Sequence, residues 1–125
     1  VLEAAGAAVG LHTDDYITDS RLFLRSAALA VREGMSREGA LKAITLANAK
    51  MMRVDDRIGS FKKGKDADLV ILSGDPFSVY THVEQTWIEG QKVWDRANPE
   101  DKKVATGGYG VFRLNTHTHT HEGGQ

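Results

Sequence analysis

Hydrophobic and polar positions divide the chain into a helical first part and a β-rich second part. The apolar run at residues 7–13 predicts a buried strand, and residues 20–33 carry apolar side chains at helical spacing. The pattern changes after Val54, and the apolar runs at residues 69–72 and 83–88 predict strands bounded by turns. We therefore expect helices before Val54 and antiparallel strands after it.

Capping signals set the limits of the predicted helices. A polar residue within 18–20 can cap the first helix, and Gly34 can end it. Its apolar arc is wide, because the polar side chains fall within about 140° when placed at ~100° per residue. We therefore expect burial on more than one side. Ser36 caps a second helix, although Gly39 stands where a capping box needs Glu or Gln.

The predicted strand at residues 7–13 runs into a carboxylate. Side chains alternate along a strand, so Leu11 and Thr13 share one face, and His12 and Asp14 share the other. A strand with an acid at its carboxyl end is how parallel α/β folds present a catalytic carboxylate. Taken alone, Asp14 is better explained as an ordinary turn residue.

Composition is that of an ordinary globular domain. The 125 residues are 41% hydrophobic and 26% charged, the net charge is −1, and cysteine is absent. The charge gives no reason to expect nucleic acid or an anionic membrane as a partner. No apolar run approaches the roughly 20 residues of a membrane helix, and the first residues have no signal-peptide pattern. We expect a cytoplasmic location.

Several short motifs stand in a fixed order between residues 5 and 96. Each motif alone is weak, but the ordered set at this spacing is specific. It resembles the C-terminal part of metal-dependent amidohydrolases, in the branch with imidazolonepropionase-like and prolidase-like members. The motifs are Gly10-Leu11-His12-Thr13-Asp14-Asp15, Asp19-Ser20-Arg21, Ala28-Leu29-Ala30-Val31-Arg32-Glu33-Gly34-Met35-Ser36, Ala43-Ile44-Thr45-Leu46, Val54-Asp55-Asp56-Arg57-Ile58-Gly59-Ser60, Gly64-Lys65-Asp66-Ala67-Asp68-Leu69-Val70, Gly74-Asp75-Pro76-Phe77 and Glu89-Gly90.

The resemblance implies an α/β fold: the C-terminal fragment of a (β/α)8 TIM-like barrel followed by half of a composite β-sandwich. Residues 1–54 would supply the last strand and helices of the barrel, and residues 55–96 the C-terminal half of the sandwich. Residues 97–125 would be a polar extension, with a disordered tail from about residue 115.

The resemblance also implies a chemistry. Such enzymes hydrolyse a C–N bond, in an amide or cyclic amide, through a metal-activated water. The acid ending the last barrel strand lies beside a divalent metal, takes a proton from the metal-bound water and passes it to the leaving amine. This assigns both the catalytic and the metal-binding role to Asp14, beside one or two metal ions, expected to be zinc. A divalent ion lowers the pKa of bound water towards ~7, and a nearby carboxylate can accept the remaining proton.

The chain departs from the family in two respects. The usual metal-binding histidines belong to earlier strands, so most ligands would lie outside this chain. A barrel needs roughly 200–250 residues, so we expect the 125 residues alone to be inactive. In addition, Leu46-Ala47-Asn48-Ala49 replaces the usual Asn-Pro-Ala segment, which we expect to change the turn geometry and not the chemistry.

Three more residues are candidates for contact with a small-molecule or peptide-like substrate. His12 shares the side of Asp14, while Tyr16 and Arg21 lie in or near the following loop. The alternatives are a hydrogen-bonded barrel histidine at His12 and an ion pair of Arg21 with Asp19 or another acid.

Other conspicuous residues have structural explanations. We assign residues 65–68 to a turn with capping carboxylates, and Trp87 and Trp94 to the core of the sandwich. The alternating histidines near the C-terminus predict adventitious metal affinity and no catalysis. They are His117, His119 and His121.

Two other functions remain open. The first is a non-catalytic structural or interaction module that packs against a partner chain, since the wide apolar arc of residues 20–33 would otherwise be exposed. A metal-binding tail protein is a third reading, and it depends on the terminal histidines alone. For the enzyme, the required partner is the remainder of the barrel.

Overall fold

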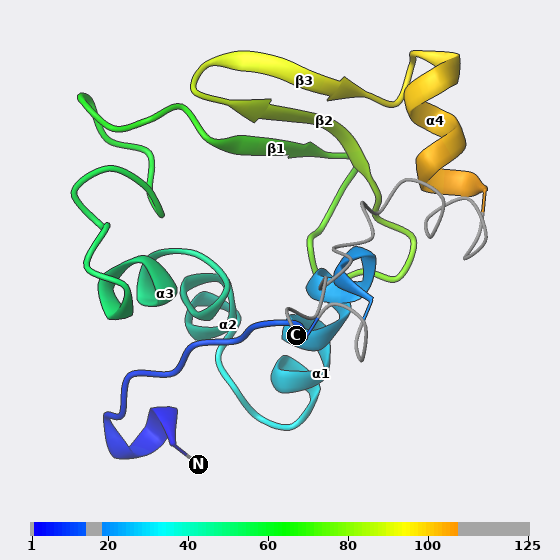
Figure 1. Ribbon diagram of the computed structural model, residues 1–125. Helices are drawn as coiled ribbons and strands as arrows, with labels where there is room; N and C mark the ends of the chain where they lie inside the picture. The colour runs from blue at the N-terminus through cyan, green and yellow to red at the C-terminus, as the bar shows by residue number, and fades with distance from the viewer. Residues whose placement is uncertain (1, 15–18, 108–125) are drawn as a thin grey trace, which may run out of the picture.

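The computed structural model describes residues 2–14 and 19–107. A group of short helices lies apart from a three-stranded sheet. The connection between β1 (Leu69–Leu72) and β2 (Val83–Ile88) reaches from the sheet towards α1 (Phe23–Arg32) (Figure 1). The mixed helix and strand content agrees with the predicted α/β class. In chain order the elements are η1 Glu3–Ala5, η2 Ser20–Leu22, α1 Phe23–Arg32, α2 Arg37–Ala43, α3 Leu46–Met51, β1 Leu69–Leu72, β2 Val83–Ile88, β3 Gln91–Asp95 and α4 Pro99–Thr106.

The capping residues lie where the sequence places them. Asp19 caps the first helical segment by accepting from the Arg21 N–H at 2.9 Å. Gly34 follows α1 with φ of 99°, a left-handed conformation that glycine adopts without steric cost. Ser36 caps α2 through its hydroxyl, which accepts from the Gly39 N–H at 2.9 Å. These bonds satisfy N–H groups that a helix start leaves without an intrahelical partner.

The fully buried core is made of alanines. Ala27 of α1, Ala40 and Ala43 of α2, and Ala49 of α3 expose 2% or less of their surface, and no larger side chain in residues 2–14 and 19–107 is fully buried. Leu29 of α1 remains 43% exposed. The expectation that α1 is buried on more than one side is therefore wrong for this chain, because no second described element covers its outer face. None of the helices in these residues is long and apolar enough to cross a membrane.

The strands form one antiparallel sheet in the order β1-β2-β3. β2 and β3 are joined by a two-residue turn in which Glu89 and Gly90 have φ of 50° and 74°. Two residues with positive φ suit the right-handed twist of a hairpin. The register shifts once in each ladder, between Ile71 and Leu72 and opposite the Thr86/Trp87 step of β2. The predicted hairpin is confirmed.

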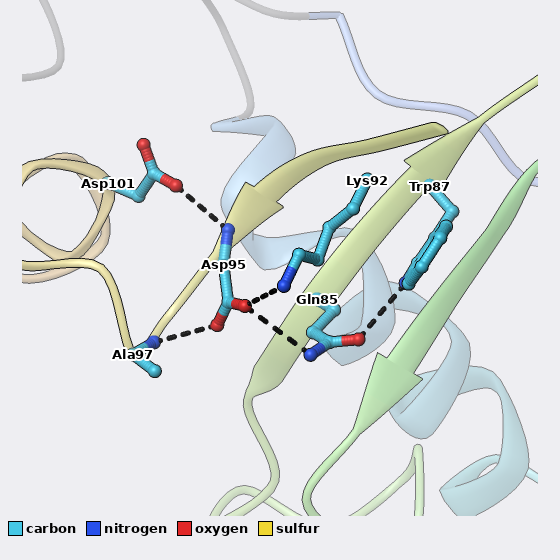
Figure 2. Close-up of polar contacts among 6 residues, drawn as sticks. All are labelled: Gln85, Trp87, Lys92, Asp95, Ala97 and Asp101. Carbon is cyan, nitrogen blue, oxygen red and sulfur yellow. Dashed lines mark hydrogen bonds and ion pairs between the residues drawn. The ribbon is translucent and has the colours of Figure 1, made fainter. Parts of the chain in front are cut away.

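Helix α4 was not expected from the sequence. Asn98 caps it by accepting from the Glu100 N–H at 3.0 Å, and Pro99 occupies its first turn. The helix is fixed to β3 because the Asp101 carboxylate accepts from the Asp95 N–H at 2.9 Å (Figure 2). The indole N–H of Trp94 also donates to the Asp101 carbonyl at 3.0 Å. Both tryptophans are half-buried.

A polar network crosses the outer part of the sheet. Trp87 donates to the Gln85 side chain at 3.1 Å, and the Asp95 carboxylate accepts from Lys92, Gln85 and the Ala97 N–H (Figure 2). The Lys92 ammonium, followed by the Ala97 N–H, holds the pKa of Asp95 below its usual range. These bonds tie the end of β3 to the turn that precedes α4.

Candidate functional site

The segment that ends at Asp14 is extended but is not part of a sheet. Residues 7–14 form no β-ladder with another described residue, so the strand predicted at residues 7–13 is not part of a sheet among the residues that the structure describes. The backbone of Leu11 bonds to the helices instead. Its N–H donates to the Ala43 carbonyl at 2.9 Å, and its carbonyl accepts from the Asn48 amide at 2.6 Å. The end of α2 and the middle of α3 therefore occupy the place of a neighbouring strand.

Gly10 permits this close approach. A Cβ atom at Gly10 would lie 2.1 Å from Asn48 Oδ1 and 3.1 Å from the Met51 sulfur. Carbon atoms in van der Waals contact lie about 3.5–4.0 Å apart, so a side chain here requires Asn48 to move. Asn48 was expected to matter only for a turn, but it holds the segment that carries Asp14. No local sequence pattern signals a contact between residues 37 positions apart.

A second long-range contact fixes the start of the same segment. The Glu3 carboxylate accepts from the Ser36 N–H at 2.8 Å and from the Ser36 hydroxyl at 2.5 Å. A Cβ at Gly39 would lie 1.9 Å from Glu3 Oε1. Glu3 thus supplies the carboxylate that a capping box would take from position 39, and glycine leaves room for it. The Ser36 hydroxyl, and then its N–H, lower the pKa of Glu3.

The side chains of the extended segment alternate as predicted. Leu11 and Thr13 are half-buried, while His12 and Asp14 are exposed. The His12 ring nitrogen Nδ1 lies 3.2 Å from the Thr13 carbonyl oxygen. Asp14 makes no hydrogen bond or ion pair with any of the residues that the structure describes. Its carboxylate is therefore accessible for a role in a larger site.

Arg21 makes the ion pair that was the alternative to substrate contact. Its guanidinium donates to Asp19 through Nε at 2.9 Å and Nη2 at 2.6 Å. This hydrogen bonding lowers the pKa of Asp19 and raises that of Arg21. Substrate contact by Arg21 or His12 stays a prediction. Tyr16 lies outside the described residues.

The described residues do not form a metal site by themselves. In residues 2–14 and 19–107, no three His, Asp or Glu side chains are grouped closely enough to hold an ion. A zinc site in a protein is formed by three or four protein ligands. Asp14 therefore suits a metal only as one ligand of a larger set. The histidines 117, 119 and 121 lie outside the described residues.

Residues 65–68 have structural contacts. The Lys65 ammonium donates to the Asp55 carbonyl, to the Ile58 carbonyl at 3.1 Å and to the Ser60 hydroxyl at 2.8 Å. Asp66 pairs with Arg57 at 2.6 Å, and the Asp68 carboxylate accepts from the Glu89 N–H at 2.8 Å. These bonds hold the long loop before β1 and connect it to the hairpin turn.

Comparison with known proteins gives a consistent result. The sequence pattern of the Amidohydrolase family matches residues 2–94. The chain is 36% identical over 77 residues to an imidazolonepropionase from Picrophilus torridus, covering 56% of this chain and 20% of the relative. It is 36% identical over 92 residues to adenine deaminase 2 from Shouchella clausii, covering 70% and 15%.

A solved structure supports the same assignment at the level of the fold. The crystal structure of an amidohydrolase from Thermotoga maritima superposes with a TM-score of 0.73 at 39% sequence identity. The match covers 76% of this chain and 25% of that protein. This chain thus spans a fifth or less of the two curated relatives and a quarter of the solved one.

Proposed function

Since the chain belongs to the amidohydrolase family, which acts on C–N bonds, we propose that it is the C-terminal part of a metal-dependent amidohydrolase with Asp14 as its proton shuttle. The observation that carries the proposal is the match over residues 2–94, with an exposed carboxylate at the end of the segment that α2 and α3 hold. The proposed substrate is a small molecule or a peptide-like compound with an amide or cyclic amide bond. A cytoplasmic location stays a prediction.

Asp14 would act by moving one proton between two atoms of the reaction. A bound divalent ion, expected to be zinc, would supply Lewis acidity and acidify water. The Asp14 carboxylate then accepts the proton of the attacking water and gives it to the leaving nitrogen, which departs as a neutral amine. The segment before Asp14 keeps this carboxylate in place through Leu11, whose backbone is bonded to Ala43 and Asn48.

We further propose that residues 7–14 are the last strand of a (β/α)8 barrel and that β1–β3 belong to a composite sandwich. Two features support this arrangement. The extended segment has no strand partner among the described residues. Within residues 2–14 and 19–107, the buried core consists of alanines, while thirteen large apolar side chains are exposed. A larger protein would cover such side chains, so the metal ligands and the rest of the barrel would come from the remainder of the polypeptide or from a partner chain.

The test of the catalytic role uses the longest natural polypeptide that contains residues 1–125. Asp14→Asn should lower kcat by about 10²–10⁴-fold, the usual contribution of a general acid–base residue. Asp56→Asn is the matched control, since Asp56 is an exposed carboxylate in a turn, and it should leave kcat unchanged. Full activity of the Asp14 variant would exclude the proposed role.

The incompleteness of the chain has a separate test. Residues 1–125 alone should show no hydrolase activity and no stoichiometric metal, since the described residues lack a group of three ligands. Size-exclusion chromatography with metal analysis measures both properties. A stable monomer with one bound zinc per chain and hydrolase activity would contradict the proposal.

A non-catalytic role is the second candidate. The alanine core and the exposed apolar side chains also suit a module that packs against a partner chain. In that case the Asp14→Asn variant would keep its partner binding, and no C–N hydrolysis would depend on Asp14. The two candidates are therefore separated by the same substitution.

A further inference from the structure

A groove separates the first helices from the sheet. It has a volume of about 480 Å³, with η2 and α1 on one side and the β1–β2 connection, β2, β3 and α4 on the other. Figure 1 shows the β1–β2 connection crossing the space between the sheet and α1. Of the candidate site residues that the structure describes, Arg21 lines this groove, whereas Asp14 and the residues that hold its segment do not. The groove therefore does not include the candidate proton shuttle.

The charged residues of the groove are cationic. Arg21, Arg25 and Arg96 line it, and no Asp or Glu of residues 2–14 and 19–107 does. Arg21 is paired with Asp19, as described above. The guanidinium groups of Arg25 and Arg96 make no hydrogen bond or ion pair with the described part of the chain. The groove therefore presents two arginines whose charge is not balanced locally.

The apolar surface of the groove is also incompletely covered. Leu22 is 42% exposed, and Val79 is 87% exposed. Trp94 lines the groove with its indole N–H already bonded to Asp101, so only its apolar ring is left to contact an occupant. Arginine and aromatic residues beside apolar side chains are the composition that is enriched at the centre of protein interfaces.

The wall formed by the β1–β2 connection is held in place. Arg37 of α2 donates to both oxygens of Asp75 at 2.7 Å, and its guanidinium carbon lies 4.9 Å from the centre of the Phe77 ring. At the other end, His82 pairs with Glu84 at 3.0 Å. A wall that is already ordered loses little conformational freedom when an occupant binds.

We propose that this groove binds an acidic, amphipathic segment of the parent polypeptide, one whose carboxylates pair with Arg25 and Arg96. The inference rests on the proposed function, which requires a larger protein. Charge complementarity selects the occupant: apolar side chains would cover Leu22, Val79 and Trp94, and the carboxylates would pair with the two arginines by charge-assisted hydrogen bonds.

Residues 108–125 of this chain do not have the required chemistry. Their apolar run, at residues 109–114, carries Arg113 and no acid, and Glu122 stands in a polar context. A second copy of the chain is a different occupant, and it would make the groove a symmetric or head-to-tail contact between copies. The cross-linking experiment described next distinguishes both of these occupants from the acidic segment that we propose.

The test is a zero-length cross-link in the longest natural polypeptide that contains this chain. Arg25→Lys and Arg96→Lys keep the charge and introduce a primary amine. A water-soluble carbodiimide then joins that amine to a carboxylate in direct contact, with loss of water. Arg53→Lys is the matched control, because Arg53 is exposed and lies outside the groove. Peptide mass spectrometry identifies the linked acid.

The expected result is a new link from position 25 or 96 to an Asp or Glu outside residues 1–125 of the same polypeptide, absent from the wild type and from the Arg53 variant. A link to Glu122, a link between two copies, or no new link would each overturn the inference. The readout needs no activity, so a failed cross-link and a failed Asp14 test are distinguishable.

Discussion

The contact between Gly10 and Asn48 provides a quantitative test of how the chain holds the segment that ends at Asp14. Gly10→Ala places a methyl group where Asn48 Oδ1 now lies, at 2.1 Å. The backbone of Gly10 is outside the left-handed region, so alanine adopts it without strain and the penalty is steric. The amide of Asn48 must rotate away, and its 2.6 Å hydrogen bond to the Leu11 carbonyl is lost.

The size of the effect follows from that bond. Leaving a part-buried carbonyl without its partner costs about 1–3 kcal/mol. Replacing glycine by alanine returns about 0.4–1 kcal/mol by restricting the unfolded chain. We expect Gly10→Ala to lower the free energy of unfolding by about 1–2 kcal/mol. Asn48→Ala loses the same bond and gains at most about 0.7 kcal/mol of helix propensity, so its expected loss is similar.

The double variant distinguishes this mechanism from a general packing defect. With Asn48 replaced by alanine, the methyl group at position 10 meets no oxygen, and the bond can be lost only once. The double variant should therefore be no less stable than Asn48→Ala, which corresponds to a coupling energy on the order of 1–2 kcal/mol. Urea unfolding followed by circular dichroism measures all four proteins.

Gly74→Ala serves as the control for this cycle. Its Cβ would lie 3.2 Å from the Thr81 hydroxyl, and its backbone is also outside the left-handed region, so its stability should change by less than about 0.5 kcal/mol. Additive losses for Gly10→Ala and Asn48→Ala would refute the reasoning. The cost at position 10 would then come from another neighbour, such as the Met51 sulfur at 3.1 Å.

Three further predictions concern the remaining supports. Ser36→Ala removes the N-cap of α2 and should cost about 0.5–2 kcal/mol in urea unfolding. Hydrogen bonds from Ser36 lower the pKa of Glu3. The stabilisation that the ionised Glu3 carboxylate provides is therefore complete above its unfolded pKa, about 4.3, and is lost as the pH falls through the lower folded value. The difference in unfolding free energy between wild type and Glu3→Gln should shrink over that range in acid titrations. Lys65→Met leaves two loop carbonyls without their donor, and hydrogen exchange should show faster opening of the loop at residues 55–65, whereas unchanged exchange would contradict the assigned role.

Local patterns predicted most of the elements because their causes are local. The caps at Asp19 and Ser36 and the hairpin at Glu89 and Gly90 each depend on residues a few positions apart. The period of two also placed His12 and Asp14 on one face, which the structure leaves exposed. Helix α4 has start signals of the same kind in Asn98-Pro99-Glu100-Asp101. This helix was not predicted because it is short and lacks an apolar stripe, and without such a stripe the sequence does not indicate how far a helix extends.

The candidate site was less predictable because its supports are long-range. The period of two predicts a strand but carries no information about whether a neighbouring strand exists, and here the neighbours of Leu11 are Ala43 and Asn48. The Glu3–Ser36 contact spans 33 positions. A glycine in the sequence does not reveal which side chain will approach it, so Gly10 was interpreted only as part of the predicted strand, and Gly39 only as an incomplete capping box.

These two glycines explain how one segment is fixed without a sheet. At Gly10 the absent side chain admits Asn48, and at Gly39 it admits Glu3. Both contacts join the segment before Asp14 to α2 and α3, and neither involves α1. Changes in those two helices should therefore reach Asp14 through Leu11, whose backbone is bonded to Ala43 and Asn48. Substitutions on the outer face of α1 should instead affect the association with the rest of the protein, because that face is exposed in this chain.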